Sequence, residues 1–427
     1  MKLLSHFLAP LITWGAIASS LTGCVVNPVT GKSQISLMSP EQEITTGTQN
    51  YVPAQQSQGG QYVVDPALTT YIQKVGKKLA AVSDRPDLPY EFVVLNNDVP
   101  NAWAMPGGKL AINRGLLVYL EDEAQLAAVL GHEIVHAAAR HGAQQQTQNV
   151  LLGAGVLIAG VAISEKKSEY GALGVGALAV GSQAWQAKYG RDHELQSDEV
   201  GMKYMIKAGY DPQAAVELQE IFVKLSEGKN AGFIEGLFAS HPPSQERVNR
   251  NRAVAQKNPG GVRNKEAYQR AIAQINKDKA AYENYQKAQK LASEKKYIDA
   301  QTYVEKSITQ QPKENLFWEM KGQLLLQQNK VSEAVPALDR AIQANPQYFK
   351  PYVFRGIAYN QLGKNDMAEK DLLTSNRYLP TQIAAYYLGE VAMAKGNRTQ
   401  AAQYYQQAAE GGGEIGEAAK GKLGKLQ

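Results

Sequence analysis

The chain has 427 residues, which is enough for two or three domains, and 44% of them are hydrophobic, as in many globular proteins. Its formal net charge of +5 is small for this length, and lysines and arginines do not gather in a dense stripe with interleaved aromatic residues. The composition therefore argues against a nucleic-acid partner.

The first 23 residues have the pattern of a secretory leader, with Lys2 followed by a mostly apolar stretch. Leu21-Thr22-Gly23-Cys24 resembles the lipobox of bacterial lipoproteins, which implies cleavage before Cys24 and acylation of its thiol. A plain secretory signal or an uncleaved anchor is the alternative. Cys24 is the only cysteine, so the mature chain offers no internal disulfide, and several acyl chains would hold it at a membrane. Val25, which is not aspartate, implies sorting to the outer membrane, facing the periplasm.

Residues 24–38 are expected to form a tether, since Asn27-Pro28 and Thr30-Gly31 are turn signals. Ser39 then starts a helix, because proline follows it and Gln42 stands three residues on, as in a capping box. The patterns that follow predict a helix over 66–82, a strand over 90–95, a hairpin over 101–112 that turns at Pro106-Gly107-Gly108, and a short helix over 115–119.

The most informative motif is His132-Glu133-Ile134-Val135-His136, inside a long predicted helix that Asp122 caps. Two histidines four residues apart lie on one helical face and can bind a single metal ion. The glutamate directly after the first can hold a metal-bound water. This H-E-x-x-H arrangement is typical of zinc hydrolases.

A catalytic zinc ion needs a third protein ligand and an open position for water. Glu194 and Asp198 lie four residues apart on another predicted helix, so they share a face. One can bind the metal while the other orients a ligand histidine, and spacing alone leaves both assignments open. His141 is nine residues after His132, about 180° around the helix, so we expect it to face away from the metal. His193 is expected to be structural.

Two charged groups and two apolar runs allow more than one interpretation. Arg191 and Arg247 are candidates to neutralise the carboxylates, but the sequence does not separate this role from a surface role.

Apolar, glycine-rich runs over 150–163 and 170–180 are each too short to span a bilayer without help. We favour a buried helical hairpin, because lipidation would already provide the anchor; membrane contact is the alternative.

The last third of the chain repeats with a period of 34 residues, which is typical of tetratricopeptide repeats. In such repeats small residues let two helices cross closely, and proline ends the second helix. Glu390 replaces the expected glycine in the fourth unit, as suits a terminal cap. The recurring positions are Ala300, Ala334, Ala368 and Ala402, then Pro312, Pro346 and Pro380, then Gly322 and Gly356.

The H-E-x-x-H motif with Glu194-x-x-x-Asp198 downstream resembles the HtpX-type and CAAX-prenyl-protease-type zinc endopeptidases, metallopeptidase family 48. The resemblance covers roughly residues 36–260. It implies one zinc ion per chain, bound by His132, His136 and Glu194, with Asp198 supporting the site. Glu133 would be the catalytic base. The two apolar runs would correspond to shortened forms of the transmembrane helices found in some members.

The same resemblance implies two further features. Asn101, Ala102, Trp103 and Ala104, ahead of Pro106-Gly107-Gly108, would form an edge strand that pairs with the substrate backbone. His241, in Ser240-His241-Pro242-Pro243, would be a fourth, inhibitory ligand or a group that stabilises the oxyanion. A loop histidine without a role is the alternative.

Together these features predict a mainly α-helical protein. An α+β, zincin-like metalloprotease domain with a small β-hairpin or sheet would precede an α-helical tetratricopeptide solenoid. The expected divisions are a lipoprotein signal peptide over 1–23, a tether over 24–38, the protease domain over 39–261, a connecting helix over 262–282 and the repeats over 283–427.

The predicted function is that of a zinc endopeptidase in the periplasm, anchored to the outer membrane through lipidated Cys24. The resemblance implies unfolded or misassembled outer-membrane proteins as substrates, and the repeats would bind substrates or partner proteins. The alternative is a tetratricopeptide chaperone or adaptor whose metal site is largely silent. The intact motif and the Glu194–Asp198 pair favour the enzyme.

Overall fold

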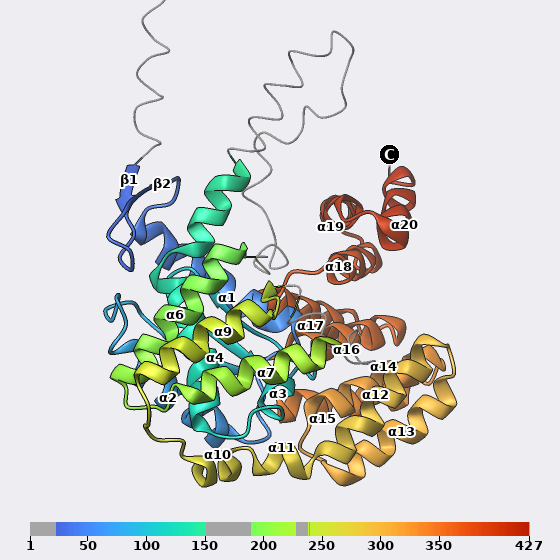
Figure 1. Cartoon of the computed structure of the whole chain (residues 1–427). Coiled ribbons are helices and arrows are strands. Elements are labelled where there is room, and N and C mark those ends of the chain that lie inside the picture. Colours follow the sequence, from blue (N-terminus) through green and yellow to red (C-terminus); the bar gives the residue numbers. More distant parts are fainter. Residues whose placement is uncertain (1–22, 151–188, 228–237, 239, 427) are drawn as a thin grey trace, which may run out of the picture.

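A computed structural model describes residues 23–150, 189–227, 238 and 240–426 (Figure 1). The predicted signal peptide, up to residue 22, and nearly all of the two apolar runs lie outside these ranges. Across the ranges that are described, no helix combines the length and the apolar character needed to cross a membrane. The mainly helical class predicted from the sequence is confirmed.

The segment predicted as a tether contains a small hairpin. Strands β1 (Gly23–Val26) and β2 (Ser33–Ser36) pair antiparallel, and the chain turns between them where the turn signals lie. The Asn27 side chain accepts from the amide of Val29 and donates to the carbonyl of Ala139 over 3.1 Å. The segment is therefore hydrogen-bonded to the end of a helix that is distant in the sequence. The sequence analysis predicted the turn but not the strands on either side of it.

The elements of the first part follow the predicted order. Ser39 and Gln42 form the capping box at the start of the first helix. The elements are α1 (Pro40–Ser57), α2 (Pro66–Ala80), β3 (Glu91–Leu95), β4 (Ala102–Met105), β5 (Lys109–Asn113), α3 (Arg114–Leu117), α4 (Glu123–Ala138), α6 (Arg191–Lys207), α7 (Gln213–Glu227) and α9 (Gln245–Lys257).

A three-stranded sheet with the order β3-β5-β4 supports the site. β4 and β5 form the predicted hairpin, while β3 joins β5 in parallel. Alternate residues serve opposite faces: Trp103 packs with Tyr51 of α1, whereas Ala102 and Ala104 belong to the core that includes α2 and α4. Both faces are thus covered by helices, which explains why these strands are nearly continuous apolar runs.

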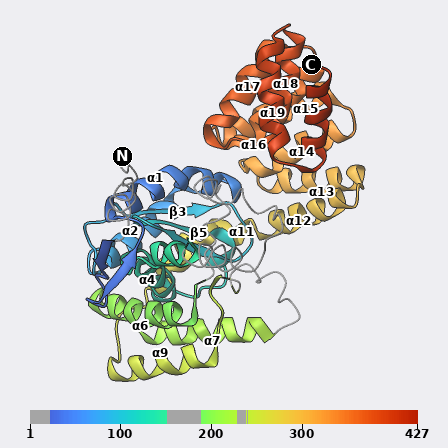
Figure 2. The same ribbon diagram turned by 90° about the horizontal axis from the view of Figure 1, so that it is seen from above.

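Short helices α10 (Lys265–Ala271) and α11 (Ala273–Lys277) occupy the region predicted as one connecting helix. Paired helices of the repeats follow and form a layered block beside the first part (Figure 2). They are α12 (Lys279–Ser293), α13 (Tyr297–Gln310), α14 (Asn315–Gln327), α15 (Val331–Ala344), α16 (Phe349–Gln361), α17 (Asn365–Tyr378), α18 (Gln382–Ala394), α19 (Arg398–Glu410) and α20 (Gly413–Gly424).

The period of the repeats changes in the last unit. The connection 345–348 has four residues, whereas the equivalent connection 379–381 has three. The buried alanine is therefore Ala401, not Ala402, and the glycine at the helix crossing is Gly389, so the expectation that Glu390 replaces it was wrong. A Cβ atom on Gly389 would lie 2.5 Å from the Tyr405 ring, which shows how closely the two helices cross.

Candidate metal centre

Helices α4 and α6 bring the two predicted halves of the site together. They cross at Gly131 and Gly201, where a Cβ atom on Gly201 would lie 3.0 Å from the backbone nitrogen of His132. Larger side chains at these positions would push the helices apart. The close crossing places Glu194 of α6 against the histidine pair of α4.

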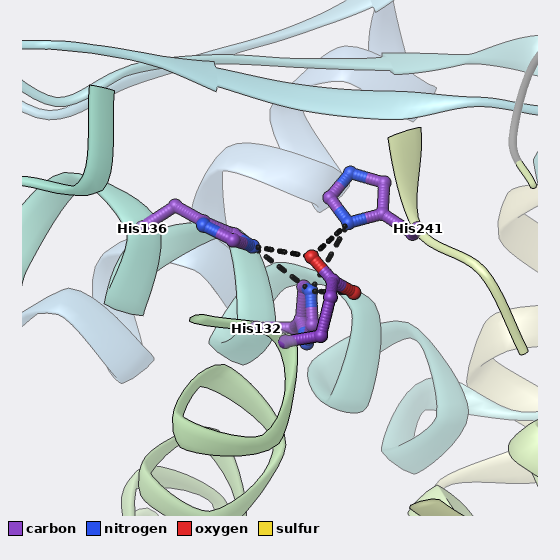
Figure 3. A group of neighbouring side chains, drawn as sticks. His132, His136 and His241 are labelled. Atoms are coloured by element: carbon purple, nitrogen blue, oxygen red, sulfur yellow. Dashed lines mark hydrogen bonds and ion pairs between the residues drawn. The ribbon is translucent and has the colours of Figure 1, made fainter. Parts of the chain in front are cut away.

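Four buried side chains converge at this crossing: His132, His136, Glu194 and His241, with donor atoms within 4.8 Å of one another (Figure 3). The Nε2 atom of His132 lies 3.0 Å from Nε2 of His136 and 3.2 Å from Nδ1 of His241. The carboxylate of Glu194 lies 3.4 Å from the Nε2 atoms of His132 and His136, and 3.0 Å from Nδ1 of His241. The four groups thus surround one point.

This donor set fits a cation of the size of zinc. Zinc binds imidazole nitrogen and carboxylate oxygen at about 2.0–2.2 Å with tetrahedral geometry, so that ligand atoms lie about 3.3 Å apart. The five distances between donor atoms given above are 3.0 to 3.4 Å, and all the donor atoms lie within 4.8 Å of one another. Lone pairs that face one another at such distances repel unless a cation or a proton lies between them. The residues present therefore suit the metal that H-E-x-x-H predicts.

Electrostatics at the cluster favour positive charge at its centre. Burial alone would lower the pKa of His132, but the carboxylates of Glu194 and Asp198 outweigh it and raise that pKa to about 10. Burial would raise the pKa of Glu194, but His241 and His132 hold it below its usual value.

Asp198 lies behind His132, where its Oδ1 atom is 2.9 Å from Nδ1 of that ring. Arg247 of α9 holds the same carboxylate through two hydrogen bonds of 2.6 and 2.7 Å, and its Nη1 atom lies 3.0 Å from Glu194. Burial would raise the pKa of Asp198, but Arg247 keeps it below its usual value. Of the two arginines that the sequence could not separate, Arg247 is in the site; Arg191 pairs with Glu246 at the surface.

The prediction that His141 lies about 180° around the helix from His132 was wrong. Helix α4 ends at Ala138, and Arg140 takes a left-handed conformation with φ of 62°, so the count of 100° per residue fails there. His141 is fully buried, and its Nδ1 atom lies 2.9 Å from Nδ1 of His136. The nearest glycine is Gly142, two residues after Arg140 and already in the next helical segment, so neither glycine nor proline stands at the break itself.

Glu133 points from α4 into the site. Its Oε1 atom lies 3.4 Å from Nε2 of His241, and its Oε2 atom has no hydrogen-bond partner among the described residues. Burial raises the pKa of this carboxyl, partly offset by His241 and His132. A raised pKa and a free oxygen suit a group that accepts a proton from water near neutral pH.

A cavity opens beside the cluster. His132, Glu133 and His241 line one side of it, and Ala102 of β4 also contributes. Side chains of α4, α6 and α7 make the remainder largely apolar, including Val129, Met202, Met205, Leu218 and Phe222. Apolar side chains therefore border the site next to the candidate metal position.

The predicted substrate strand lies close by. Ala102, Trp103 and Ala104 are in β4, which ends the strand order of the sheet as far as the described residues go, and Asn101 immediately precedes it. Their side chains are buried, so only backbone groups of this strand could pair with another chain. Cys24 is in β1, and its side chain lies outside the described part of the structure.

The fold and the donor cluster define a metallopeptidase of the H-E-x-x-H type. The profile described as Peptidase family M48 matches residues 66–255, and that of the tetratricopeptide repeat matches 285–349 and 355–415. The chain is 30% identical over 184 residues to the metalloprotease YcaL of Escherichia coli (strain K12), covering 41% of this chain and 68% of that protein. The chain therefore belongs to peptidase family M48.

Two longer relatives share both parts. The chain is 27% identical over 344 residues to the beta-barrel assembly-enhancing protease of Yersinia pestis, covering 74% of this chain and 69% of that protein. It is 26% identical over 351 residues to the protein of the same name from Escherichia coli (strain K12), covering 75% and 70%. The chain is thus a metalloprotease with tetratricopeptide repeats.

Proposed function

We propose that this protein is a zinc endopeptidase that degrades unfolded or misassembled outer-membrane proteins. The convergence of His132, His136 and Glu194 on one point beside the Glu133 carboxyl carries the proposal. The names of the two longer relatives support a role in β-barrel assembly. The apolar cavity agrees with such substrates, because unfolded chains expose the large apolar side chains that folded proteins bury.

His132, His136 and Glu194 would hold one zinc ion, and Asp198 and Arg247 would keep His132 in place. A bound zinc ion lowers the pKa of a coordinated water and polarises the carbonyl of the scissile bond. Glu133 would accept a proton from the attacking water on its free oxygen and would pass it to the leaving amine. The free oxygen of Glu133 and its position beside the donor cluster support this role.

The substrate would bind extended along β4, from Asn101 to Ala104, and pair through backbone groups. Ala102 belongs both to this strand and to the lining of the cavity, so a side chain of a paired substrate could enter the cavity. The repeats would bind substrates or partner proteins. A signal peptide over 1–23, lipidation at Cys24 and anchoring to the outer membrane on its periplasmic face complete the proposal. The protease domain would extend over 39–261, ahead of the connecting region 262–282 and the repeats.

The Glu133→Gln variant tests the proposed chemistry. It should bind zinc as the wild type does and keep its fold, but lose cleavage of an unfolded β-barrel protein by at least ~100-fold, because the base is gone. Zinc content by elemental analysis and cleavage followed on gels would be compared. Retention of cleavage would remove Glu133 from its role, and a wild-type chain without a bound metal would reject the zinc enzyme altogether.

His241 would be a fourth ligand that closes the site until substrate displaces it. Its Nδ1 atom lies within the cluster, at 3.2 Å from His132 and 3.0 Å from Glu194. His241→Ala should open one coordination position, which raises cleavage of small peptides several-fold and leaves one zinc ion bound. Loss of cleavage with zinc retained would instead favour a role for His241 in stabilising the oxyanion.

A further inference from the structure

His141 lies directly behind the candidate ligand His136, on the side away from the cluster. The Nδ1 atoms of the two rings are 2.9 Å apart, and the Nε2 atom of His141 lies 2.7 Å from Oε1 of Gln196. The three side chains form a line that runs from the Gln196 amide, through both rings, to the Nε2 atom that faces His132 and Glu194.

The direction of hydrogen bonding along this line follows from simple chemistry. The amide oxygen of Gln196 only accepts, so His141 carries its hydrogen on Nε2. A neutral imidazole has one hydrogen, which leaves Nδ1 of His141 as an acceptor. His136 must then donate from its own Nδ1 atom, and its Nε2 atom keeps the lone pair that points into the cluster.

Ring stacking prevents either imidazole from turning out of this arrangement. Tyr189 lies against His136, with ring centroids 3.8 Å apart and an angle of 19° between the planes. His193 lies in the same way against His141, at 4.1 Å and 18°. The order of donors and acceptors is therefore held by packing as well as by hydrogen bonds.

The two ligand histidines differ in what stands behind them. His132 has the carboxylate of Asp198 at its Nδ1 atom, whereas His136 has a neutral ring. We propose that His141, oriented by Gln196, is a positioning residue that fixes the tautomer of His136 and keeps its Nε2 atom available to a divalent cation. This inference rests on the proposed zinc site and adds a residue to it that the motif does not contain.

The break after α4 is what puts His141 in this place. Arg140 holds the left-handed conformation through an ion pair with Glu43 of α1 and a hydrogen bond of 2.7 Å to the carbonyl of Met38. Arg85 also contacts Glu43, at 3.0 Å. A continuous helix would carry His141 to the opposite face, away from His136. The break in the helix is therefore needed to place His141 behind His136.

Variants of His141 test the inference through zinc affinity, measured by competition with a chelating dye. His141→Leu removes the acceptor and should weaken zinc binding about 10–100-fold. His141→Asn keeps an oxygen close to the position of Nδ1 and should recover most of that loss. Gln196→Leu, at a half-buried position, should weaken binding as well, whereas Gln196→Glu keeps the acceptor and should not. Equal affinities for the wild type and the two leucine variants would overturn the proposal.

Nitrogen-15 NMR of the histidine rings in the full-length wild-type protein gives a second test that needs no variant. It should find His141 protonated at Nε2 and the zinc-loaded His136 protonated at Nδ1. A hydrogen on Nδ1 of His141 would refute the inference even if zinc binds and Glu133→Gln is inactive. A wild type that binds no zinc would refute the proposed function instead, so the two failures can be told apart.

Discussion

At the scale of single residues, Arg247 is the group that lets two carboxylates stay buried next to each other. Glu194 and Asp198 are 3% and 7% exposed, and the guanidinium contacts both, at 3.0 and 2.6 Å. A buried charge that loses its partner is costly, and a metal ion bound at this point would also supply positive charge. The role of Arg247 should therefore depend on whether the metal is bound.

We expect Arg247→Met to destabilise the metal-free protein by about 3–5 kcal/mol, because two buried carboxylates lose their cation while the packing of the stem is kept. Zinc should reduce this cost, since the ion supplies charge at Glu194. Urea unfolding with a chelator and with zinc would measure both values. Arg191→Met is the matched control: this arginine is 71% exposed, so its loss should leave stability unchanged in either state. An equal cost with and without zinc would contradict the expected link.

At the scale of elements, helical periodicity predicted what lies within a helix but not where the helix stops. Two residues four positions apart share a face of any unbroken helix. The sequence therefore sufficed to pair His132 with His136 on one helix, and Glu194 with Asp198 on another. His141 lies beyond the end of α4, and its position depends on Glu43, a residue of another helix. No local pattern contains that information, since Arg140 and Glu43 lie 97 positions apart in the sequence.

The repeats illustrate the same limit. A fixed period located the helices of the first units, because each unit packs only on its neighbours and keeps the same length. The connection 379–381 is one residue shorter than its equivalent, and this shifts the repeat pattern by one position. Ala401 and Gly389 therefore take the places that a fixed period gives to Ala402 and Glu390. The sequence alone did not show which of the adjacent residues Ala401 and Ala402 is buried. That depends on how closely Gly389 approaches Tyr405.

The break at Arg140 can be tested by two substitutions that remove the same contacts. Arg140→Ala and Arg140→Gly both lose the ion pair with Glu43 and the bond to Met38. Glycine adopts the left-handed conformation at φ of 62° without strain, so the alanine variant should be less stable by about 1 kcal/mol. Urea unfolding of both variants would measure the difference. Equal stabilities, or a less stable glycine variant, would mean that the chain leaves this conformation once the ion pair is lost.

At the scale of the whole molecule, the repeats dock on the protease domain through polar groups that are buried. The Glu314 carboxylate, at the start of α14, accepts from Asn96 over 2.8 Å and from Tyr282 over 2.5 Å. Asn96 in turn accepts from Arg114 of α3. Asn96 begins the connection that leads into β4, so the docking of the repeats and the placement of the proposed substrate strand share one segment.

Glu314 should make the stability of the docked molecule depend on pH. Burial raises the pKa of its carboxyl above the usual 4.5, partly offset by the hydrogen bond from Tyr282. A raised carboxyl pKa favours the protonated form in the folded state. The stability that this group contributes is therefore complete below about pH 4.5 and is lost as pH rises through the folded pKa.

Glu314→Gln carries no charge at any pH and removes this dependence. We expect the stability of the wild type to exceed that of the variant most below about pH 4.5, with a difference that shrinks as pH rises above that value. Urea unfolding of both proteins at steps of pH would follow that difference, and the other carboxyl groups cancel in the comparison. Glu414→Gln, at an exposed position of α20, is the control and should show no such trend. A difference that grows with pH would mean that Arg114 and Asn96 stabilise a charged Glu314, so that the two domains are joined by a buried anion instead of a buried acid.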